Sequence, residues 1–275
     1  ILMELTLEQI KNTTFGALNV FQDEQGIHFR RFTERQVDVL LNPKYGRDYD
    51  TTGIRLDFHT DASRIHLYVA SEGKYEILVD DLSVYWERLN EPTHVFLPLG
   101  SGDKRVTVVL PSHTEGILEK LILDDATYAQ PHKHAIKFAF YGDSITQGWN
   151  SEKDSQSYAW LTTRYFDANS MNFGVGGTTF IPEFPEDIGF DPDVVIVALG
   201  TNDYGKEKTM EQINADIARI VLEQCHGNQM RVVERHGKIH CRRQRHNAGN
   251  RGHYKNGGTV FIFLLYTGMK TAIFM

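Results

Sequence analysis

The chain has 275 residues, of which 41% are hydrophobic, and a formal net charge of −7. This length can hold one large domain or two ordinary ones, and the hydrophobic share is sufficient for a sizeable core. The negative charge balance gives no reason to expect nucleic acid or an anionic membrane surface as a partner. No apolar run reaches the roughly eighteen residues that a membrane-spanning helix needs.

The first residues and the cysteine content both bear on the cellular setting of the chain. The first residues lack a basic stretch followed by an apolar core, so we expect no signal peptide. Cys225 and Cys241 are the only cysteines, which is too few for a disulfide framework. We therefore expect a reduced, cytoplasmic setting.

Residues 1–130 are predicted to be all-β. The segment Arg64–Val69 alternates cleanly, with Ile65, Leu67 and Val69 on one face. Short strands separated by Gly, Asp and Pro turns favour a sandwich or jelly roll. The candidate strands are Phe15–Phe21, Ile27–Phe32, Ile54–His59, Arg64–Ala70, Tyr75–Val79, Val95–Leu97, Arg105–Leu110 and Ile117–Leu123.

Aromatic and histidine side chains in this region allow more than one interpretation. Tyr85 and Trp86 could stack on a sugar, but we favour partly buried positions in the sandwich. Seven of the twelve histidines precede residue 135, and none has a ligand-like partner at metal-binding spacing. We therefore predict surface or core histidines and no metal site.

After the segment 131–134, Pro-His-Lys-His, the pattern changes to alternating strands and helices. We interpret this segment as a linker between a first domain, 1–130, and a second, 135–275. The segment Val194–Val197 is apolar on both faces, as expected for a parallel sheet that is covered on both sides. The predicted elements are strands Ile136–Tyr141, Ser170–Phe173 and Val194–Leu199, and helices Ser157–Phe166 and Lys208–Gln224. The last helix has an apolar stripe made of Met210, Ile213, Ile217, Ile220 and Val221.

A serine, Ser144, follows the strand Ile136–Tyr141 directly. Open α/β sheets place their sites just past the carboxyl ends of their strands. A helix that begins near Ser144 would direct its unpaired N–H groups at a developing oxyanion. Taken alone, Ser144 could equally be a helix N-cap.

Three ordered blocks resemble the signature of one known family. They are Gly142-Asp143-Ser144-Ile145-Thr146, Asn172-Phe173-Gly174-Val175-Gly176-Gly177-Thr178 and Gly200-Thr201-Asn202-Asp203. Together they resemble the first three blocks of the GDSL, or SGNH, esterases and lipases. The resemblance covers roughly residues 135 to 220 and implies a flavodoxin-like α/β hydrolase with a parallel sheet. Some carbohydrate esterases of this family carry a β-sandwich before the hydrolase, which we expect here to shape one wall of the cleft rather than to bind sugar by itself.

The resemblance also implies roles for individual residues. Ser144 would be the nucleophile. Its own N–H, the Gly177 N–H and the Asn202 side-chain amide would form the oxyanion hole. Asp143 and Asp203 would be supporting hydrogen-bonding residues, and neither a metal nor an organic cofactor is implied.

The family's fourth block, Asp-x-x-His, which carries the base and its orienting acid, is missing. No aspartate follows Asp216, and the base and orienting acid are therefore unknown. The remaining candidates for a base are His226, His236, His240, His246 and His253. Without an imidazole the serine proton has no good acceptor near neutral pH, so we expect very low activity.

The candidate histidines lie in an atypical carboxyl-terminal part, residues 225–275. Residues 226–258 contain eight Lys or Arg, one acidic residue and five histidines. A nucleic-acid-binding patch and a disordered tail are two interpretations, but we favour replacement of the native terminus by a reading-frame shift. We expect no strand pattern in 226–258, one possible strand at Thr259–Tyr266, and no histidine within hydrogen-bonding reach of Ser144.

The predicted function is hydrolysis of small acyl esters, foremost the deacetylation of carbohydrates. The expected partner is thus an acyl ester or an acetylated carbohydrate, not nucleic acid or a membrane, and the oligomeric state is left open. The alternatives are a lipid or lysophospholipid acylhydrolase and a non-catalytic carbohydrate-binding protein.

Overall fold

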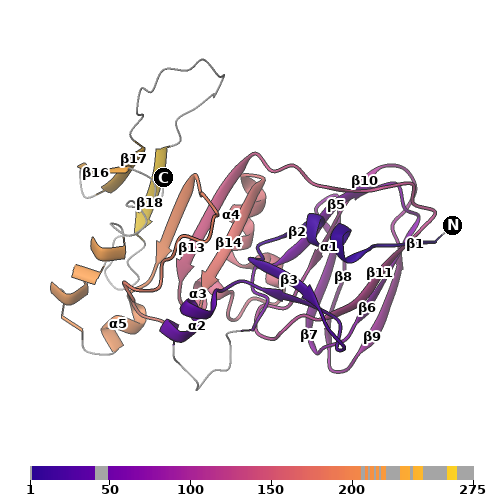
Figure 1. Ribbon diagram of the computed structural model, residues 1–275, viewed down its shortest axis with the longest axis horizontal. Coiled ribbons are helices and arrows are strands. Elements are labelled where there is room, and N and C mark those ends of the chain that lie inside the picture. Colours follow the sequence, from indigo (N-terminus) through magenta and orange to yellow (C-terminus); the bar gives the residue numbers. More distant parts are fainter. Residues whose placement is uncertain are drawn as a thin grey trace, which may run out of the picture.

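The computed structural model describes most of the chain. Residues 2–40 and 49–205 are described, together with 208, 209, 211–213, 215, 216 and 218–220, and the backbone of 230–235, 238–243 and 259–264. Two antiparallel sheets form the amino-terminal region, and a third sheet lies beside them (Figure 1).

The first antiparallel sheet has the order β3-β4-β11-β6-β9, with β1 paired to β11, and the second has the order β12-β5-β10-β7-β8, with β2 paired to β5. The strands of the first sheet are β1 Leu2–Glu4, β3 Asn19–Gln22, β4 Ile27–Arg30, β6 Arg64–Val69, β9 Thr93–Pro98 and β11 Leu118–Asp124. Those of the second are β2 Thr14–Phe15, β5 Arg55–Thr60, β7 Gly73–Val79, β8 Leu82–Leu89, β10 Lys104–Val109 and β12 Ala129–Pro131.

One hydrophobic core is shared by the two antiparallel sheets. Ile65 and Leu67 of β6 belong to the same buried cluster as Phe58 of β5 and Val108 of β10. The predicted inward face of β6 is therefore confirmed. Tyr85 is half-buried and packs against this core, in agreement with the favoured interpretation of that residue.

The prediction that the amino-terminal region is all-β is wrong at two helices. Helix α1 spans Leu7–Thr13, and α2 spans Glu34–Leu40. In α1, the Thr6 hydroxyl accepts from the Gln9 N–H at 3.2 Å, and the Gln9 side chain accepts from the Thr6 N–H at 2.9 Å. Thr33 and Gln36 exchange the same pair of hydrogen bonds before α2, at 3.0 and 3.1 Å. Both segments carry a Thr-x-x-Gln capping box, a sequence signal that strand periodicity overlooked.

Strands β1, β8 and β12 were also absent from the prediction. Strand β8 is an edge strand whose side chains are mostly exposed, so it lacks the apolar alternation by which strands are recognised. Strands β1 and β12 have only three residues each, which is too few to establish a period.

Three neighbouring parallel strands of the third sheet lie in the order β14-β13-β15. Their bounds are β13 Ile136–Gly142, β14 Ala168–Gly174 and β15 Val194–Ala198. Gly142 at the end of the central strand pairs with Gly174 and with Ala198. These strands confirm the predicted parallel sheet. The connecting helices are α3 Ser144–Gln147, η1 Asp154–Gln156, α4 Tyr158–Tyr165 and α5 Thr201–Gly205.

Both faces of this parallel sheet are buried. Phe138 and Phe140 pack with Ala159 of α4 on one face. Ala139 and Tyr141 lie in a second cluster on the other face. Helix α4 confirms the helix predicted at Ser157–Phe166.

The helix predicted at Lys208–Gln224 is confirmed in part. Residues 211–213, 215, 216 and 218–220 are helical, and Ile213 and Ile220 are buried in the second cluster. The other members of the predicted stripe, Met210, Ile217 and Val221, lie outside the described residues.

The carboxyl-terminal strands extend the third sheet. Strand β18, Thr259–Leu264, pairs parallel with β15, and β17, Lys238–Arg243, and β16, Met230–Arg235, follow in antiparallel order. The prediction of no strand in 226–258 is therefore wrong, whereas the strand predicted at Thr259–Tyr266 is confirmed. Strands β16 and β17 are separated by two residues, the length of the commonest β-hairpin loops. Their interspersed Arg and Lys concealed the apolar pattern.

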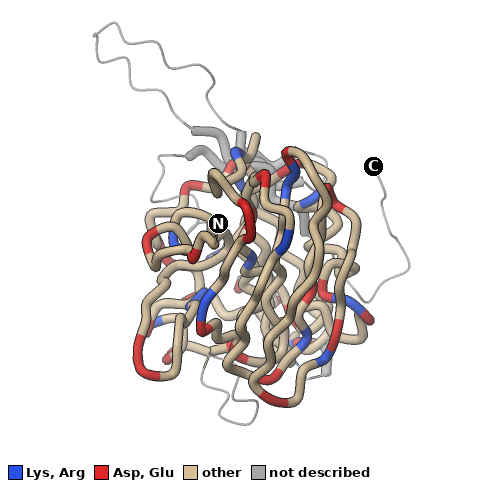
Figure 2. Tube along the Cα trace, turned by 90° about the vertical axis from the view of Figure 1, so that its right-hand side faces the viewer, with Lys and Arg blue, Asp and Glu red and all other residues tan. Residues whose placement is uncertain are grey.

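Acidic and basic residues are interspersed along the described chain (Figure 2). Among the described helices, none combines the length and apolar character needed to cross a membrane.

Candidate active site

The three predicted blocks meet at one edge of the parallel sheet. Gly142 is level with Gly174 and Ala198 at the carboxyl ends of the three strands. Ser144 comes two residues after the central strand, Gly177 three residues after β14 and Asn202 four residues after β15. The fold therefore brings the three blocks to the edge where open α/β sheets bind their ligands.

Ser144 is the first residue of helix α3, and Asp143 caps that helix. The Asp143 carboxylate accepts from the Ile145 N–H at 2.9 Å. The N-cap role that Ser144 could have had is thus filled by its neighbour. Ser144 is partly exposed, and within the described part of the chain its hydroxyl makes no hydrogen bond.

Asp143 is committed to the backbone and is buried. Burial raises the pKa of Asp143, the Ile145 N–H opposes that shift, and the nearby charge of Asp203 adds to it. The Asp143 carboxylate, which binds the first turn of α3, therefore stabilises the turn that carries Ser144.

Glycines at the ends of two strands let α3 pack closely on the sheet. A Cβ on Gly142 would come within 1.8 Å of Thr146 Oγ1, and one on Gly174 within 2.6 Å of the Gln147 N. The Asn172 amide closes the gap by donating to Thr146 O at 2.9 Å and accepting from the Gly174 N–H at 2.8 Å. The first and second blocks are therefore one packed unit.

The second block turns at its glycine pair. Thr178 N–H donates to Val175 O at 3.1 Å, and Gly177 has a φ of +79°, which favours glycine. The Gly176 N–H donates to Gln147 Oε1 at 2.8 Å. The Gly176 N–H is thus committed to a side chain of α3.

Asn202 and Asp203 join the third block to the second. Asn202 Nδ2 donates to Thr178 O at 2.9 Å, which uses one of its two amide hydrogens and fixes the orientation of the amide. Asp203 is fully buried, accepts from the Phe180 N–H at 3.1 Å and pairs with Lys208 at 3.0 Å. The side chain of Asp203 thus braces the loop beside Asn202.

A buried network from the amino-terminal region supports this edge of the sheet. Arg31, which is fully buried, donates to Asn172 O at 2.9 Å and to Gly174 O at 2.8 Å, and it pairs with Asp50 at 2.7 Å. Gln147 Nε2 donates to the same Asp50 carboxylate at 2.9 Å. Sequence reasoning missed Arg31 and Asp50, because nothing in the chain marks a partner 141 residues away.

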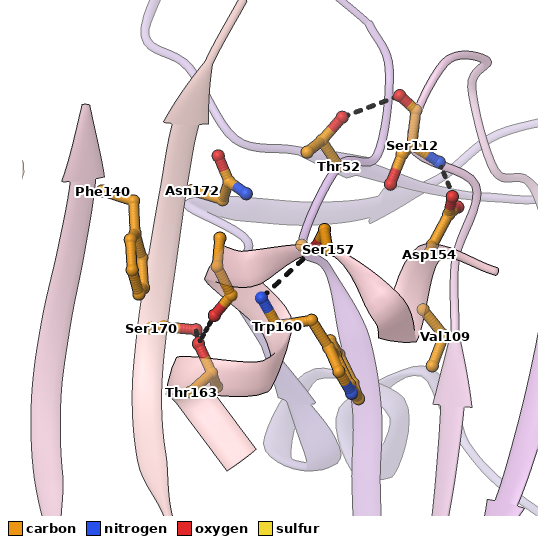
Figure 3. A pocket seen from close by; sticks show the side chains of 12 residues that line it. Thr52, Val109, Ser112, Phe140, Asp154, Ser157, Trp160, Thr163, Ser170 and Asn172 are labelled. Atoms are coloured by element: carbon orange, nitrogen blue, oxygen red, sulfur yellow. Dashed lines mark hydrogen bonds between the residues drawn. The ribbon is translucent and has the colours of Figure 1, made fainter. Parts of the chain in front are cut away.

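A small cavity lies between the antiparallel sheets and helix α4 (Figure 3). There the Ser112 N–H donates to the Asp154 carboxylate at 2.8 Å, and Thr52 Oγ1 donates to Ser112 O at 2.8 Å. Burial raises the pKa of Asp154 to about 6. These bonds join loops of the amino-terminal region to the segment that precedes α4.

Within the described part of the chain, no histidine side chain hydrogen-bonds to Ser144. His226, His236, His246 and His253 lie outside the described residues. Only the backbone of His240 is described.

The backbone register places His240 far from Ser144. His240 pairs with Phe261, Phe261 with Val194, and Val194 with Phe138. Phe138 precedes Gly142, the last residue of β13 and two residues before Ser144, by four residues, a distance of about 13 Å along the strand. The strand that carries His240 is thus level with the opposite half of β13.

Sequence reasoning also missed a histidine cluster. His132 and His134, between β12 and β13, meet Asp167 at the amino end of β14, with ligand atoms within 4.8 Å of one another. The prediction considered only spacing along the sequence, whereas this convergence arises in the folded chain. A His-x-His pair was the available signal, but its third member is remote in the sequence.

The three blocks lie within a match to a known family. Residues 140–259 match the model of the GDSL-like lipase/acylhydrolase family, the family that these blocks resemble. The match continues past residue 220, where the recognisable blocks end. No curated protein matches the sequence.

Solved structures share the fold at low sequence identity. A salicylyl-acyltransferase from a tetracycline biosynthetic pathway has a TM-score of 0.65 and 19% identity, over 77% of this chain and 66% of that chain, just under two thirds of its length. A family two carbohydrate esterase from Cellvibrio japonicus has a TM-score of 0.58 and 16% identity, over 81% and 74% of the two chains. A family two carbohydrate esterase from Clostridium thermocellum, in complex with cellohexaose, has a TM-score of 0.57 and 17% identity, over 76% and 72%.

Proposed function

We propose that this chain is an SGNH-type serine esterase that hydrolyses small acyl esters and deacetylates carbohydrates. The observation that carries the proposal is the convergence of Ser144, Gly177 and Asn202 at the carboxyl edge of three adjacent parallel strands. In this proposal residues 135–275 form the catalytic domain, and residues 1–130 shape one wall of its cleft.

The proposed reaction uses Ser144 as nucleophile. Its Oγ attacks the acyl carbon, and the resulting oxyanion accepts hydrogen bonds from the N–H groups of Ser144 and Gly177 and from the Asn202 amide. The C–O bond to the sugar alcohol then breaks and leaves an acyl-serine, which water hydrolyses to the carboxylic acid and free Ser144. A base must take the serine proton and deliver it to the leaving alcohol.

We further propose that this chain is impaired, because that base is missing from it. Among the described residues no imidazole hydrogen-bonds to Ser144, and the sequence has no Asp-x-x-His block. Removing a triad member typically leaves only the contributions of the oxyanion hole and of binding, which are orders of magnitude weaker.

The carbohydrate assignment is supported by the similar solved structures. Two of them are family two carbohydrate esterases, and one of these is in complex with cellohexaose. The similarity extends over 81% and 76% of the present chain and so includes part of its antiparallel β region. A lipid acylhydrolase and a non-catalytic sugar-binding protein remain the alternatives that an experiment has to separate.

Acetate release from acetylated cello-oligosaccharides tests the proposal. Ser144→Ala should abolish any release, and an organophosphonate should label Ser144 first. Ser101→Ala, a change at an exposed loop serine, is the matched control and should leave both signals intact. Labelling elsewhere, with Ser144→Ala fully active, would defeat the assignment of the nucleophile.

The alternatives give different results in the same assay. A preference for long-chain esters would indicate the lipid acylhydrolase. Binding of the deacetylated oligosaccharide, with no acetate released even from a chain with a restored carboxyl terminus, would indicate the non-catalytic protein.

Rereading the coding DNA tests the impairment. A one- or two-base shift near the codons for Glu223 to Gly227 should reveal a frame that encodes Asp-x-x-His. A chain made in that frame should release acetate several orders of magnitude faster. If no frame encodes the block, the replaced-terminus hypothesis fails.

A further inference from the structure

Three side chains converge at the amino edge of the parallel sheet, opposite the Ser144 site. His132 Nε2 lies 2.8 Å from Asp167 Oδ1, and His134 Nδ1 lies 3.3 Å from the same oxygen. The side chains of His132 and His134 are 14% and 4% exposed, and that of Asp167 is 40% exposed. The cluster is therefore buried on the histidine side and open to solvent on the carboxylate side.

The backbone holds Asp167 in place. Its φ is +47°, a conformation that is uncommon for residues other than glycine. The Ala135 N–H donates to Asp167 O, and the Asp167 N–H donates to Arg164 O, both at 3.1 Å. Backbone hydrogen bonds alone therefore connect the linker to the turn after α4.

Each histidine has a partner on its other ring nitrogen. His132 Nδ1 lies 2.9 Å from His59 Nε2, and His134 Nε2 lies 3.4 Å from the Asp57 carboxylate. Metal-bound histidines almost always donate their second ring N–H to a carboxylate, a backbone carbonyl or water, which fixes the ring orientation and raises its basicity. Asp57 is such an acceptor for His134, and the unprotonated Nε2 of His59 would take that role for His132. Both acceptors come from strand β5 of the amino-terminal region.

We propose that His132 Nε2, His134 Nδ1 and one Asp167 carboxylate oxygen bind a zinc ion. Zinc–ligand distances of about 2.0–2.1 Å in a tetrahedral site place neighbouring ligand atoms roughly 3.3 Å apart. The separation between His134 Nδ1 and Asp167 Oδ1, 3.3 Å, matches that spacing, whereas the 2.8 Å between His132 Nε2 and the same oxygen must widen by about 0.5 Å to admit the ion. The solvent-facing side of the carboxylate offers the fourth position to water. The ion would join the linker, β14 and, through the outer acceptors, β5.

Two arginine side chains near the proposed site would repel a bound cation. Arg105 Nη1 lies 3.4 Å from Asp167 Oδ1, and Arg55 Nη2 lies 3.3 Å from His134 Nε2. Asp57 offsets both charges, because it accepts from Arg105 at 2.8 and 2.7 Å and lies 3.5 Å from Arg55. We therefore expect weaker zinc binding than at a four-cysteine site.

The alternative is a metal-free chain of hydrogen bonds. In that arrangement Arg55 donates to His134, His59 donates to His132, and both linker histidines donate to Asp167. The two arrangements place the ring protons on different nitrogens, so the metal decides between them. Zinc titration therefore separates them directly.

The experiment compares zinc binding by the full chain and two double variants. Dialysed protein is titrated with Zn²⁺ and followed by calorimetry and thermal unfolding. His132→Gln/His134→Gln should lose one zinc equivalent and the accompanying rise in Tm. His66→Gln/His94→Gln is the matched control, because these histidines and Asp124 form a linear chain of 3.1 Å contacts rather than a convergent site.

Zinc held by other cysteines or histidines of the chain would persist in both double variants. Equal zinc stoichiometry and equal Tm shifts in the wild type and both variants would overturn the proposal. The wild type bound to Co²⁺ should show tetrahedral absorption bands without thiolate charge transfer. Thiolate charge transfer at the equivalent lost in the first variant would also overturn it.

A milder change protects the test against loss of folding. His59→Ala removes only the outer partner of His132 and should weaken zinc binding about tenfold or more with unchanged circular dichroism. Unchanged affinity in this variant would contradict the assigned coordination through His132 Nε2.

Discussion

At each end of strand β14 a buried arginine donates to backbone carbonyls, but the functional side chains at the two ends differ. At the carboxyl end Arg31 donates to Asn172 O and Gly174 O, and at the amino end Arg55 donates to Ala168 O at 2.8 Å. Both arginines are buried and come from the amino-terminal region. That region is therefore part of the scaffold at each edge of the parallel sheet.

The chemistry differs because the side chains around each anchor differ. The carboxyl edge has the Ser144 hydroxyl near Gly177 and the Asn202 amide but, among the described residues, no imidazole bonded to the serine. The amino edge has three histidines in contact and no serine among them. Proximity to a particular edge, rather than the number of histidines in the chain, decides whether an imidazole can serve Ser144.

The largest expected effect is a difference in the free energy of unfolding between variants of Arg31 and Arg55. Arg31→Met should lower the free energy of unfolding by about 3–5 kcal/mol, because it leaves Asp50 buried without its cationic partner. Arg55→Met should cost less, since Asp57 keeps both hydrogen bonds from Arg105. Urea unfolding measures both variants, and an equal or larger loss for Arg55→Met would refute the difference between the edges.

The next effect tests the acyl chemistry at the carboxyl edge. Asn202→Ala should raise the activation free energy by roughly 2.7–4 kcal/mol, because one oxyanion donor is lost. The rate of acetate release, measured on a chain whose Asp-x-x-His block has been restored, reports this change. The His132→Gln/His134→Gln variant at the other edge serves as the control, and an unchanged kcat in Asn202→Ala would make Asn202 a loop residue only.

An effect of intermediate size is expected on the pH dependence of the free energy of unfolding, through Asp154. Burial raises the pKa of Asp154 to about 6, from an ordinary value of 3.8. The folded chain then binds more protons than the unfolded chain between these values, so this group makes stability fall as pH rises from about 4 to 6. The loss at neutral pH is on the order of 2–3 kcal/mol.

Asp154→Asn should flatten this pH dependence, as measured by urea unfolding at pH 4, 5, 6 and 7. Ser112 can keep its hydrogen bond to the amide oxygen of the variant, so the fold is expected to persist. The same slope in Asp154→Asn and wild type would show that other groups set the pH dependence.

The smallest expected effect is the loss of stability when either capping box is removed. Thr6→Ala and Thr33→Ala should each lower the free energy of unfolding by about 1 kcal/mol. Val37 of α2 packs against the cluster that contains Tyr141 and Val197 of the parallel sheet, whereas Ile10 of α1 lies in the core of the antiparallel sheets. Thr33→Ala should therefore slow phosphonate labelling of Ser144 more than Thr6→Ala does, and equal labelling rates would contradict this coupling.

The sequence alone determined the local units of the parallel sheet. Strand β13, the turn at Gly142 and helix α3 are contiguous, so one short segment encodes apolar periodicity, the glycine that allows close packing and the serine. The same holds for the second and third blocks, and parallel strands bring their ends to one edge without further information. The predicted gathering of Ser144, Gly177 and Asn202 at that edge needed nothing else.

Tertiary structure alone decided which remote side chains support those units. Arg31 and Asp50 brace the second block, and Asp167 meets the two linker histidines, through contacts between segments that share no periodicity. A single buried arginine or aspartate looks like a surface residue in the sequence, because its burial depends on a partner that the local pattern does not specify. The hairpin β16–β17 was missed for a related reason, since its pairing with β18, rather than its own apolar content, places it in the sheet.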